Sequence, residues 1–126
     1  MILKEDTFTY KNFKELLSNE EVNTYLELAR YMTEDNLLYL YQKSQRHEAV
    51  IDRIAKTLGV SRKTIQNRIS SIIKKQHENR YFLYKPNSTI KGEYFLSPEL
   101  VLKDYRYYDI IYKEILPKLE KEAIAP

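Results

Sequence analysis

Five polar side chains between positions 62 and 70 have the types and the spacing needed to contact a nucleic acid. They are Arg62, Lys63, Gln66, Asn67 and Ser70. On a helix they share one face, and no acidic residue interrupts them. Guanidinium, ammonium, amide and hydroxyl groups are the ones that contact phosphates and base edges. The alternative is an ordinary helical hairpin with a solvated basic face.

The residues around this face predict the two helices of a helix-turn-helix over 46–75. The second helix begins after Ser61, a good N-cap, and its other face is apolar, with Ile65, Ile69, Ile72 and Ile73 at three- and four-residue spacing. Before it, Ile54, Ala55 and Leu58 form an apolar stripe. Gly59 supplies the permissive backbone of the turn, and Val60 is expected to be buried after it.

Charge is concentrated on the same segment. Residues 1–42 hold 4 basic and 8 acidic residues, residues 43–75 hold 9 basic and 2 acidic residues, and residues 76–126 hold 8 of each, which sums to the net charge of +3. A local cationic surplus is typical of a surface that binds a polyanion. Binding that depends on phosphate contacts should weaken steeply as salt rises.

The segments before the helix-turn-helix have weaker patterns. Residues 1–17 are expected to form an arm, either extended or used for docking. A first helix is predicted over 18–33, capped by Ser18 or Asn19, with acidic residues in its first turn. The apolar run 37–41 could be a short buried strand or more helix, which periodicity alone does not separate, and we favour the strand.

After the second helix, residues 80–97 predict a β-hairpin. The aromatic run 81–84 and the run 93–96 have strand character, and residues 85–92 between them are rich in turn formers. Such a hairpin behind a helix-turn-helix would be a wing. Its polar tip could touch a DNA backbone through Lys85, Asn87, Ser88, Thr89 and Lys91. The alternative is a plain hairpin that only covers the core.

The C-terminal segment 98–123 is predicted to be helical from Leu100, after Pro98 at a helix start. Pro117 should end or kink this helix. An apolar seam recurs every three or four residues and consists of Val101, Tyr105, Tyr108, Tyr112, Ile115 and Leu119. The seam either packs on the first helix of its own chain or pairs with a second subunit. We expect a homodimer, because small DNA-binding modules often act in pairs. The candidate surfaces are the C-terminal helix, through Tyr105, Tyr108, Tyr112, Ile115 and Leu119, and the N-terminal segment.

These motifs together resemble a known fold. The stretch VIDRIAKTLGVSRKTIQNRISSIIKK is similar to the helix-turn-helix of winged-helix regulators and replication initiators, and YFLYKPNSTIKGEYFLSPEL resembles the wing exit of small plasmid replication proteins of the RepL type. The likeness covers residues 37–97, about half of the chain, and departs at Ser97, where those proteins more often have Asn before the proline. It implies a mainly α fold with a small β-hairpin wing (α+β), a single winged helix-turn-helix domain with N- and C-terminal helical extensions.

The resemblance also implies roles for individual residues. The groove-facing set would be Arg62, Lys63, Gln66, Asn67 and Ser70, with Ser61 and Thr64 at the helix start. Backbone contacts would come from Arg68, Lys74 and the polar residues of the wing, including Lys85, Asn87 and Lys91.

Composition and motifs disfavour an enzyme. The chain has no cysteine, only two histidines and only two glycines, so thiolate metal sites and a Gly-rich phosphate loop are excluded. His47 and His77 lack the spacing of metal ligands. A tyrosine nucleophile among residues 105–112 would need a metal or a basic cluster, and only Arg106 is near. We therefore expect no catalytic residue, metal or cofactor, and no small-molecule effector.

The predicted function is sequence-specific binding of double-stranded DNA in a replication or transfer initiator, or an accessory protein, of a plasmid or phage. Replication or transfer proteins are possible partners. Two alternatives stay open: a transcriptional regulator that binds operators as a dimer, and an adaptor that binds proteins and no longer touches DNA. With no signal peptide and no membrane-spanning run, a cytoplasmic location without membrane partners is expected.

Overall fold

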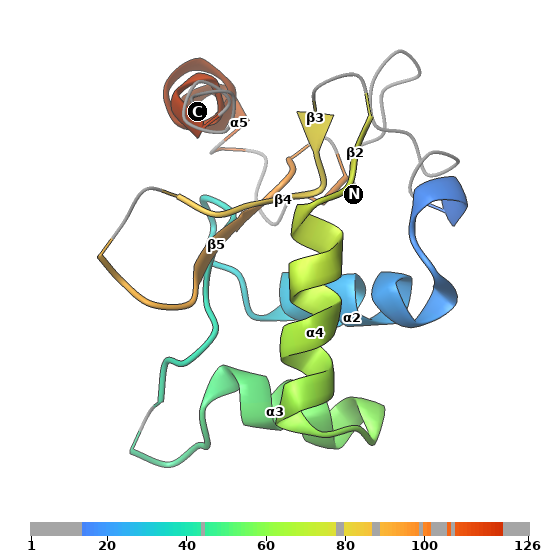
Figure 1. Ribbon diagram of the computed structural model, residues 1–126. Helices are drawn as coiled ribbons and strands as arrows, with labels where there is room; N and C mark the ends of the chain where they lie inside the picture. Colours follow the sequence, from blue (N-terminus) through green and yellow to red (C-terminus); the bar gives the residue numbers. More distant parts are fainter. Residues whose placement is uncertain are drawn as a thin grey trace.

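A computed structural model of the chain describes residues 14–43, 45–77, 80–86, 89–98, 100–101, 106 and 108–119. Their fold is mixed α+β, with helices packed on both faces of a small antiparallel sheet. In Figure 1, α2, α3 and α4 form one layer, the strands lie beside it, and the C-terminal helix lies beyond the strands.

Helix α2 (Asn19–Arg30) begins with the predicted cap. The Ser18 hydroxyl accepts from the Glu21 backbone N–H at 3.1 Å, and the Glu21 carboxylate accepts from the Ser18 backbone N–H at 2.9 Å, which completes a capping box. The helix ends at Arg30, with Tyr31 as its C-cap, earlier than the predicted bound of residue 33. Residues 14–16 are helical, so this part of the predicted arm is not extended.

Helices α3 (Val50–Leu58) and α4 (Arg62–Ile73) form the predicted hairpin. Residues 46–49 lie outside α3, because the backbone N–H of Val50 donates instead to the Gln42 carbonyl. Gly59 ends α3 with φ of 68°, the left-handed conformation that favours glycine. Val60 is only half-buried, because it lies at the edge of the core.

The main sheet has the strand order β1-β5-β4, all antiparallel. It consists of β1 (Leu37–Tyr39), β4 (Leu83–Tyr84) and β5 (Glu93–Leu96), so the predicted strand at 37–41 and the hairpin are confirmed in shortened form. A second pair, β2 (Gln76–His77) with β3 (Arg80–Tyr81), was not predicted.

Side chains alternate between the two faces of this sheet, and both faces are buried. Leu38, Leu83 and Leu96 belong to the main core with the buried isoleucines of α3 and α4. Tyr84 and Phe95 point to the other face and form a second cluster with the C-terminal helix. The register agrees, since Leu83 pairs with Leu96 and Tyr84 pairs with Phe95.

One buried tyrosine ties the layers together. The Tyr25 hydroxyl on α2 donates to the Phe82 carbonyl at 2.7 Å and accepts from the Ser97 backbone N–H at 3.2 Å. Burial raises the pKa of Tyr25 far above its ordinary value, so its proton stays in place at physiological pH. This contact fixes the ends of the hairpin against the helical layer.

The C-terminal helix differs from its prediction. Leu100 and Val101 are not helical: both donate their backbone N–H to the Ser97 carbonyl and are buried in the main core. Helical structure runs instead through α5 (Tyr108–Ile110), the π-helical turn η2 (Ile111–Ile115) and residues 116–119. Pro117 therefore does not end the helix. The π-helical turn ends at Ile115, one residue before Leu116 and two before the proline, and this wider turn accommodates the missing N–H and the ring.

Candidate nucleic-acid interface

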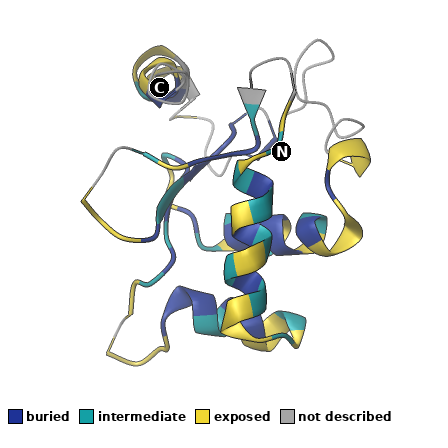
Figure 2. Cartoon of the chain, in the orientation of Figure 1, coloured by how far each residue is buried: buried dark blue, intermediate teal, exposed yellow. Residues whose placement is uncertain are grey.

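Four polar side chains form an exposed row along α4. Lys63, Asn67, Ser70 and Lys74 follow one another at intervals of four, three and four residues, and all four are exposed. Because they sit opposite the buried Ile65, Ile69 and Ile72, they point away from the core. Figure 2 shows exposed positions repeating along the outer side of α4. Among the described residues, none of the four has a hydrogen bond or ion pair with another side chain.

The start of α4 is built to be rigid. The Ser61 hydroxyl accepts from the Thr64 backbone N–H at 3.1 Å and lies 2.9 Å from the Thr64 hydroxyl. Thr64 is only half-exposed. These two residues therefore act first as the helix cap, and the N-terminal end of α4 carries no acidic residue that would repel a phosphate.

One side of the row faces the β4–β5 loop, and we call it the hairpin flank: Tyr41, Arg62, Gln66, Lys91 and Gly92. Gln66 Nε2 donates to the Tyr41 hydroxyl at 3.0 Å. The Arg62 guanidinium carbon and Lys91 Nζ each lie 5.6 Å from the centre of the Tyr41 ring. Cations at this distance from an aromatic face are attracted to it.

Arg62 has a second, stronger partner on α3. Its Nε and Nη2 donate to the two carboxylate oxygens of Asp52 at 3.0 Å each, a bidentate pair that holds the two helices together. This bond raises the pKa of Arg62. Arg62 is exposed, but its charge is already matched within the protein.

The other side of the row faces α2, and we call it the α2 flank: Glu20, Glu21, Thr24, Arg68 and Lys75. Arg68 Nη1 donates to the Thr24 hydroxyl at 3.3 Å. Lys75 Nζ lies 2.5 Å from a carboxylate oxygen of Glu21, whose side chain is 8% exposed. Burial alone would raise the pKa of Glu21, but hydrogen bonds from Lys75, Ser18 and Ser71 outweigh it and lower that pKa to about 2.

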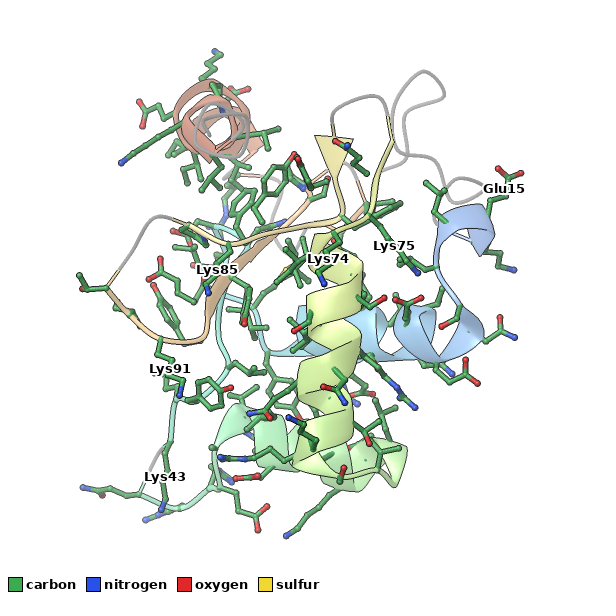
Figure 3. All side chains as sticks on the ribbon, in the orientation of Figure 1. Glu15, Lys43, Lys74, Lys75, Lys85 and Lys91 are labelled. Atoms are coloured by element: carbon green, nitrogen blue, oxygen red, sulfur yellow. The ribbon has the colours of Figure 1, made fainter. Side chains whose placement is uncertain are left out.

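Each flank borders a shallow hollow. The one on the α2 flank is about 290 Å³, and two of its lining residues are Glu20 and Glu21. The one beside the hairpin flank is about 400 Å³ and is lined by Tyr39, Tyr41, Gln42, Ile90 and Lys91. In Figure 3, Lys43, Lys85 and Lys91 lie on the hairpin side of the molecule, whereas Lys75 points toward α2. On the described surface around α4, the lysines without a carboxylate partner are therefore on the row and the hairpin side.

No family model, curated protein or solved structure matches this chain. The assignment of function therefore depends on the site itself.

The structure separates the predicted groove-facing residues into two groups. Lys63, Asn67 and Ser70 are exposed as expected, and Lys74 continues their row. Arg62 and Gln66 lie beside the row and are held by Asp52 and Tyr41. Arg68, expected to contact the DNA backbone, turns instead toward α2, because position 68 lies on the side of α4 that packs there.

The wing residues are partly described. Lys85, Thr89 and Lys91 are exposed, and Asn87 and Ser88 lie outside the described residues. Tyr41 and Asp52 were missed by the sequence analysis. Tyr41 was assigned to a buried run, and no local pattern indicates that its partner is Gln66, 25 residues away. Asp52 lies 10 positions before Arg62, so their contact depends on how the two helices cross.

The predicted dimer seam is used, at least in part, inside the subunit. Leu119 is buried and Ile115 packs beside it, against the face of the sheet that carries Tyr84 and Phe95, rather than on the first helix. Tyr105 lies outside the described residues. Tyr108 and Tyr112 belong to the C-terminal helix, but their side chains are not described.

No group of three or more histidine, aspartate or glutamate side chains among the described residues is arranged to hold a metal ion. No helix in the described ranges is both long enough and apolar enough to span a membrane.

Proposed function

We propose that this protein is a winged helix that binds double-stranded DNA by placing α4 in the major groove. The order of elements supports this fold: α2, β1, α3, the turn at Gly59 and α4 are followed, after the short β2–β3 pair, by the β4–β5 hairpin, and β1 pairs with β5 at its edge. In a helix-turn-helix the second helix is the one that enters the groove. Here that helix is α4, and it carries the exposed row.

The row of Lys63, Asn67, Ser70 and Lys74 is the observation that carries the proposal. It runs for about 16 Å along the helix at 1.5 Å per residue, and the major groove is wide enough to admit a helix. Lysines at its two ends suit phosphates or guanine, and the Asn67 amide suits adenine. Lys85 and Lys91 on the hairpin would contact the neighbouring backbone.

The biological role that we propose is a replication or transfer initiator, or an accessory protein, of a plasmid or phage. A transcriptional regulator that binds operators would use the same interface. Two copies on a repeated or palindromic site would double the contact length. Such a dimer would use surfaces other than Leu119, which is buried in its own subunit.

Salt-dependent binding to a random-sequence duplex tests the proposal. The variant Lys63→Ala/Lys74→Ala removes both lysines of the row, and Lys113→Ala/Lys118→Ala is its matched control, because these lysines are also exposed but lie on the C-terminal helix. Fluorescence anisotropy at about 50 to 200 mM salt should give a steep slope of log affinity against log salt for the wild type. The slope should fall by about two in the row variant and stay unchanged in the control. Equal slopes for the two variants, or no salt dependence, would overturn the proposal and favour a protein-binding adaptor.

A further inference from the structure

Tyr41 occupies a special position beside the candidate interface. It follows β1, yet its hydroxyl reaches across to α4 and accepts the hydrogen bond from Gln66. Its ring also lies near the cations of Arg62, from α4, and Lys91, from the β4–β5 loop. One side chain therefore joins the start of α4 to the hairpin.

The Tyr41 ring is itself held in place. Gly92, with φ of 78°, brings its backbone so close to the ring that a Cβ there would lie 2.8 Å from Tyr41 Cε2. The Gly92 carbonyl accepts from the Leu40 backbone N–H at 2.9 Å, which fixes the two backbone segments together. The hydroxyl that receives the Gln66 amide is thus on a ring with little freedom to move.

This contact leaves Gln66 with the groups that adenine recognition needs. A primary amide has two N–H donors and one carbonyl oxygen. Bidentate pairing with adenine uses one N–H, toward N7, and the oxygen, which accepts from the N6 amino group. The second N–H is free for another partner, and Tyr41 supplies that partner. A glutamine held this way also loses less side-chain entropy when it binds a base.

We propose that Tyr41 is a positioning residue that orients the Gln66 amide for recognition of adenine in the major groove. The inference rests on the proposed DNA-binding function and adds a determinant of sequence preference to it. Arg62 strengthens the arrangement, because its bidentate bond with Asp52 keeps the guanidinium beside the Tyr41 ring. Tyr41 itself need not touch the DNA.

The test is a selection from a randomised duplex pool, carried out with the full-length wild type, Tyr41→Phe, Gln66→Ala and the double variant. In the duplexes selected by the wild type, one base-pair position should be enriched in A·T, and Gln66→Ala should abolish that preference. Tyr41→Phe should weaken the preference at the same position by about 2- to 12-fold, the effect of one lost hydrogen bond. In the double variant, the preference should match that of Gln66→Ala alone, because the two residues act through one contact.

Tyr39→Phe is the matched control. Tyr39 lines the same hollow, and its hydroxyl makes no hydrogen bond among the described residues. Its variant should keep the wild-type preference, and the slope of affinity against salt should be unchanged in all variants. A uniform loss of affinity in Tyr41→Phe, with the preference intact, would mean a merely structural role and would overturn the inference. So would a Gln66→Ala variant that keeps the A·T preference. If instead the wild type binds no duplex, the proposed function itself fails.

Discussion

The two flanks of α4 each contain one arginine and one lysine but use them differently. On the hairpin flank, the cations of Arg62 and Lys91 lie over the ring of Tyr41; Arg62 is also paired with Asp52, whereas Lys91 has no carboxylate partner among the described residues. On the α2 flank, Lys75 is bound to the buried Glu21 and Arg68 to Thr24. The cations beside α4 can therefore be divided into those on the α2 flank, which stabilise the fold, and Lys91 on the β4–β5 loop, which remains available to a ligand.

The difference also predicts which side of α4 a bound duplex would cover. Glu20 and Glu21 line the hollow on the α2 flank and would repel phosphates there. Lys43, Lys85 and Lys91 lie on the hairpin side. A duplex that contacts the exposed row should thus extend over the hairpin rather than over α2.

The largest effect is expected from Glu21, which should matter for stability and not for DNA. The pKa of Glu21 in the folded protein is about 2, below the ordinary value of 4.5. The carboxylate therefore contributes fully to the free energy of unfolding above pH 4.5, and this contribution is lost as the pH falls from 4.5 toward 2. A shift of this size corresponds to about 2–4 kcal/mol. Urea denaturation across this pH range should reveal the loss in the wild type, and Glu21→Gln should be destabilised at neutral pH by a similar amount.

Glu20→Gln is the control for that experiment, since Glu20 is the exposed neighbour in the same helical turn. It should leave the free energy of unfolding nearly unchanged. Folded Glu21→Gln should keep the wild-type salt dependence of duplex binding. A change in that slope would mean that the α2 flank contacts DNA, and the contrast between the flanks would be lost.

An intermediate effect is expected at the two glycines, of which only one supports the hairpin flank. Gly59→Ala has open space around it but a φ of 68°, so it should cost about 1 kcal/mol in the free energy of unfolding. Gly92→Ala has the same kind of backbone strain and must also displace the Tyr41 ring, so about 1–3 kcal/mol is expected. Thermal denaturation of both variants measures the difference.

The glycine pair also distinguishes the roles of the two turns in binding. At a temperature where both variants are folded, Gly92→Ala should weaken duplex binding more than Gly59→Ala, because it moves Tyr41 and the hairpin cations together. Equal binding by the two variants would indicate that the hairpin flank does not take part in the interface.

Much of the fold could be predicted from local patterns. The isoleucines of α4, the cap at Ser61 and the turn at Gly59 specify two helices with little help from the rest of the chain. The C-terminal segment could not be predicted as well. The non-helical conformation of Leu100 and Val101 depends on tertiary contacts. Asn36, 65 residues away in the sequence, donates from its Nδ2 to the Val101 carbonyl at 2.8 Å. No periodicity contains that information.

The candidate site was predictable to a similar degree. Helical spacing placed Lys63, Asn67 and Ser70 on one exposed face. The same spacing placed Arg62 and Gln66 there, but it could not indicate the partners that hold them, because Asp52 and Tyr41 come from other elements. A sequence pattern identifies which side chains share a face, whereas the packing of the elements decides which of them remain free.

The smallest effect is expected from Asp52, whose carboxylate neutralises Arg62 next to the exposed row. Asp52→Asn removes one negative charge, while its amide oxygen can still accept a hydrogen bond from Arg62. The variant should therefore bind a random duplex about two- to fivefold more tightly at low salt, which is the range of a single exposed charge interaction. The slope of log affinity against log salt should also steepen by about one. Asp109→Asn is the matched control, since Asp109 is exposed on α5; it should change neither quantity. Weaker binding by Asp52→Asn would mean that the α3–α4 ion pair is needed to orient α4, and Arg62 would then belong with Lys75 among the cations that serve the fold.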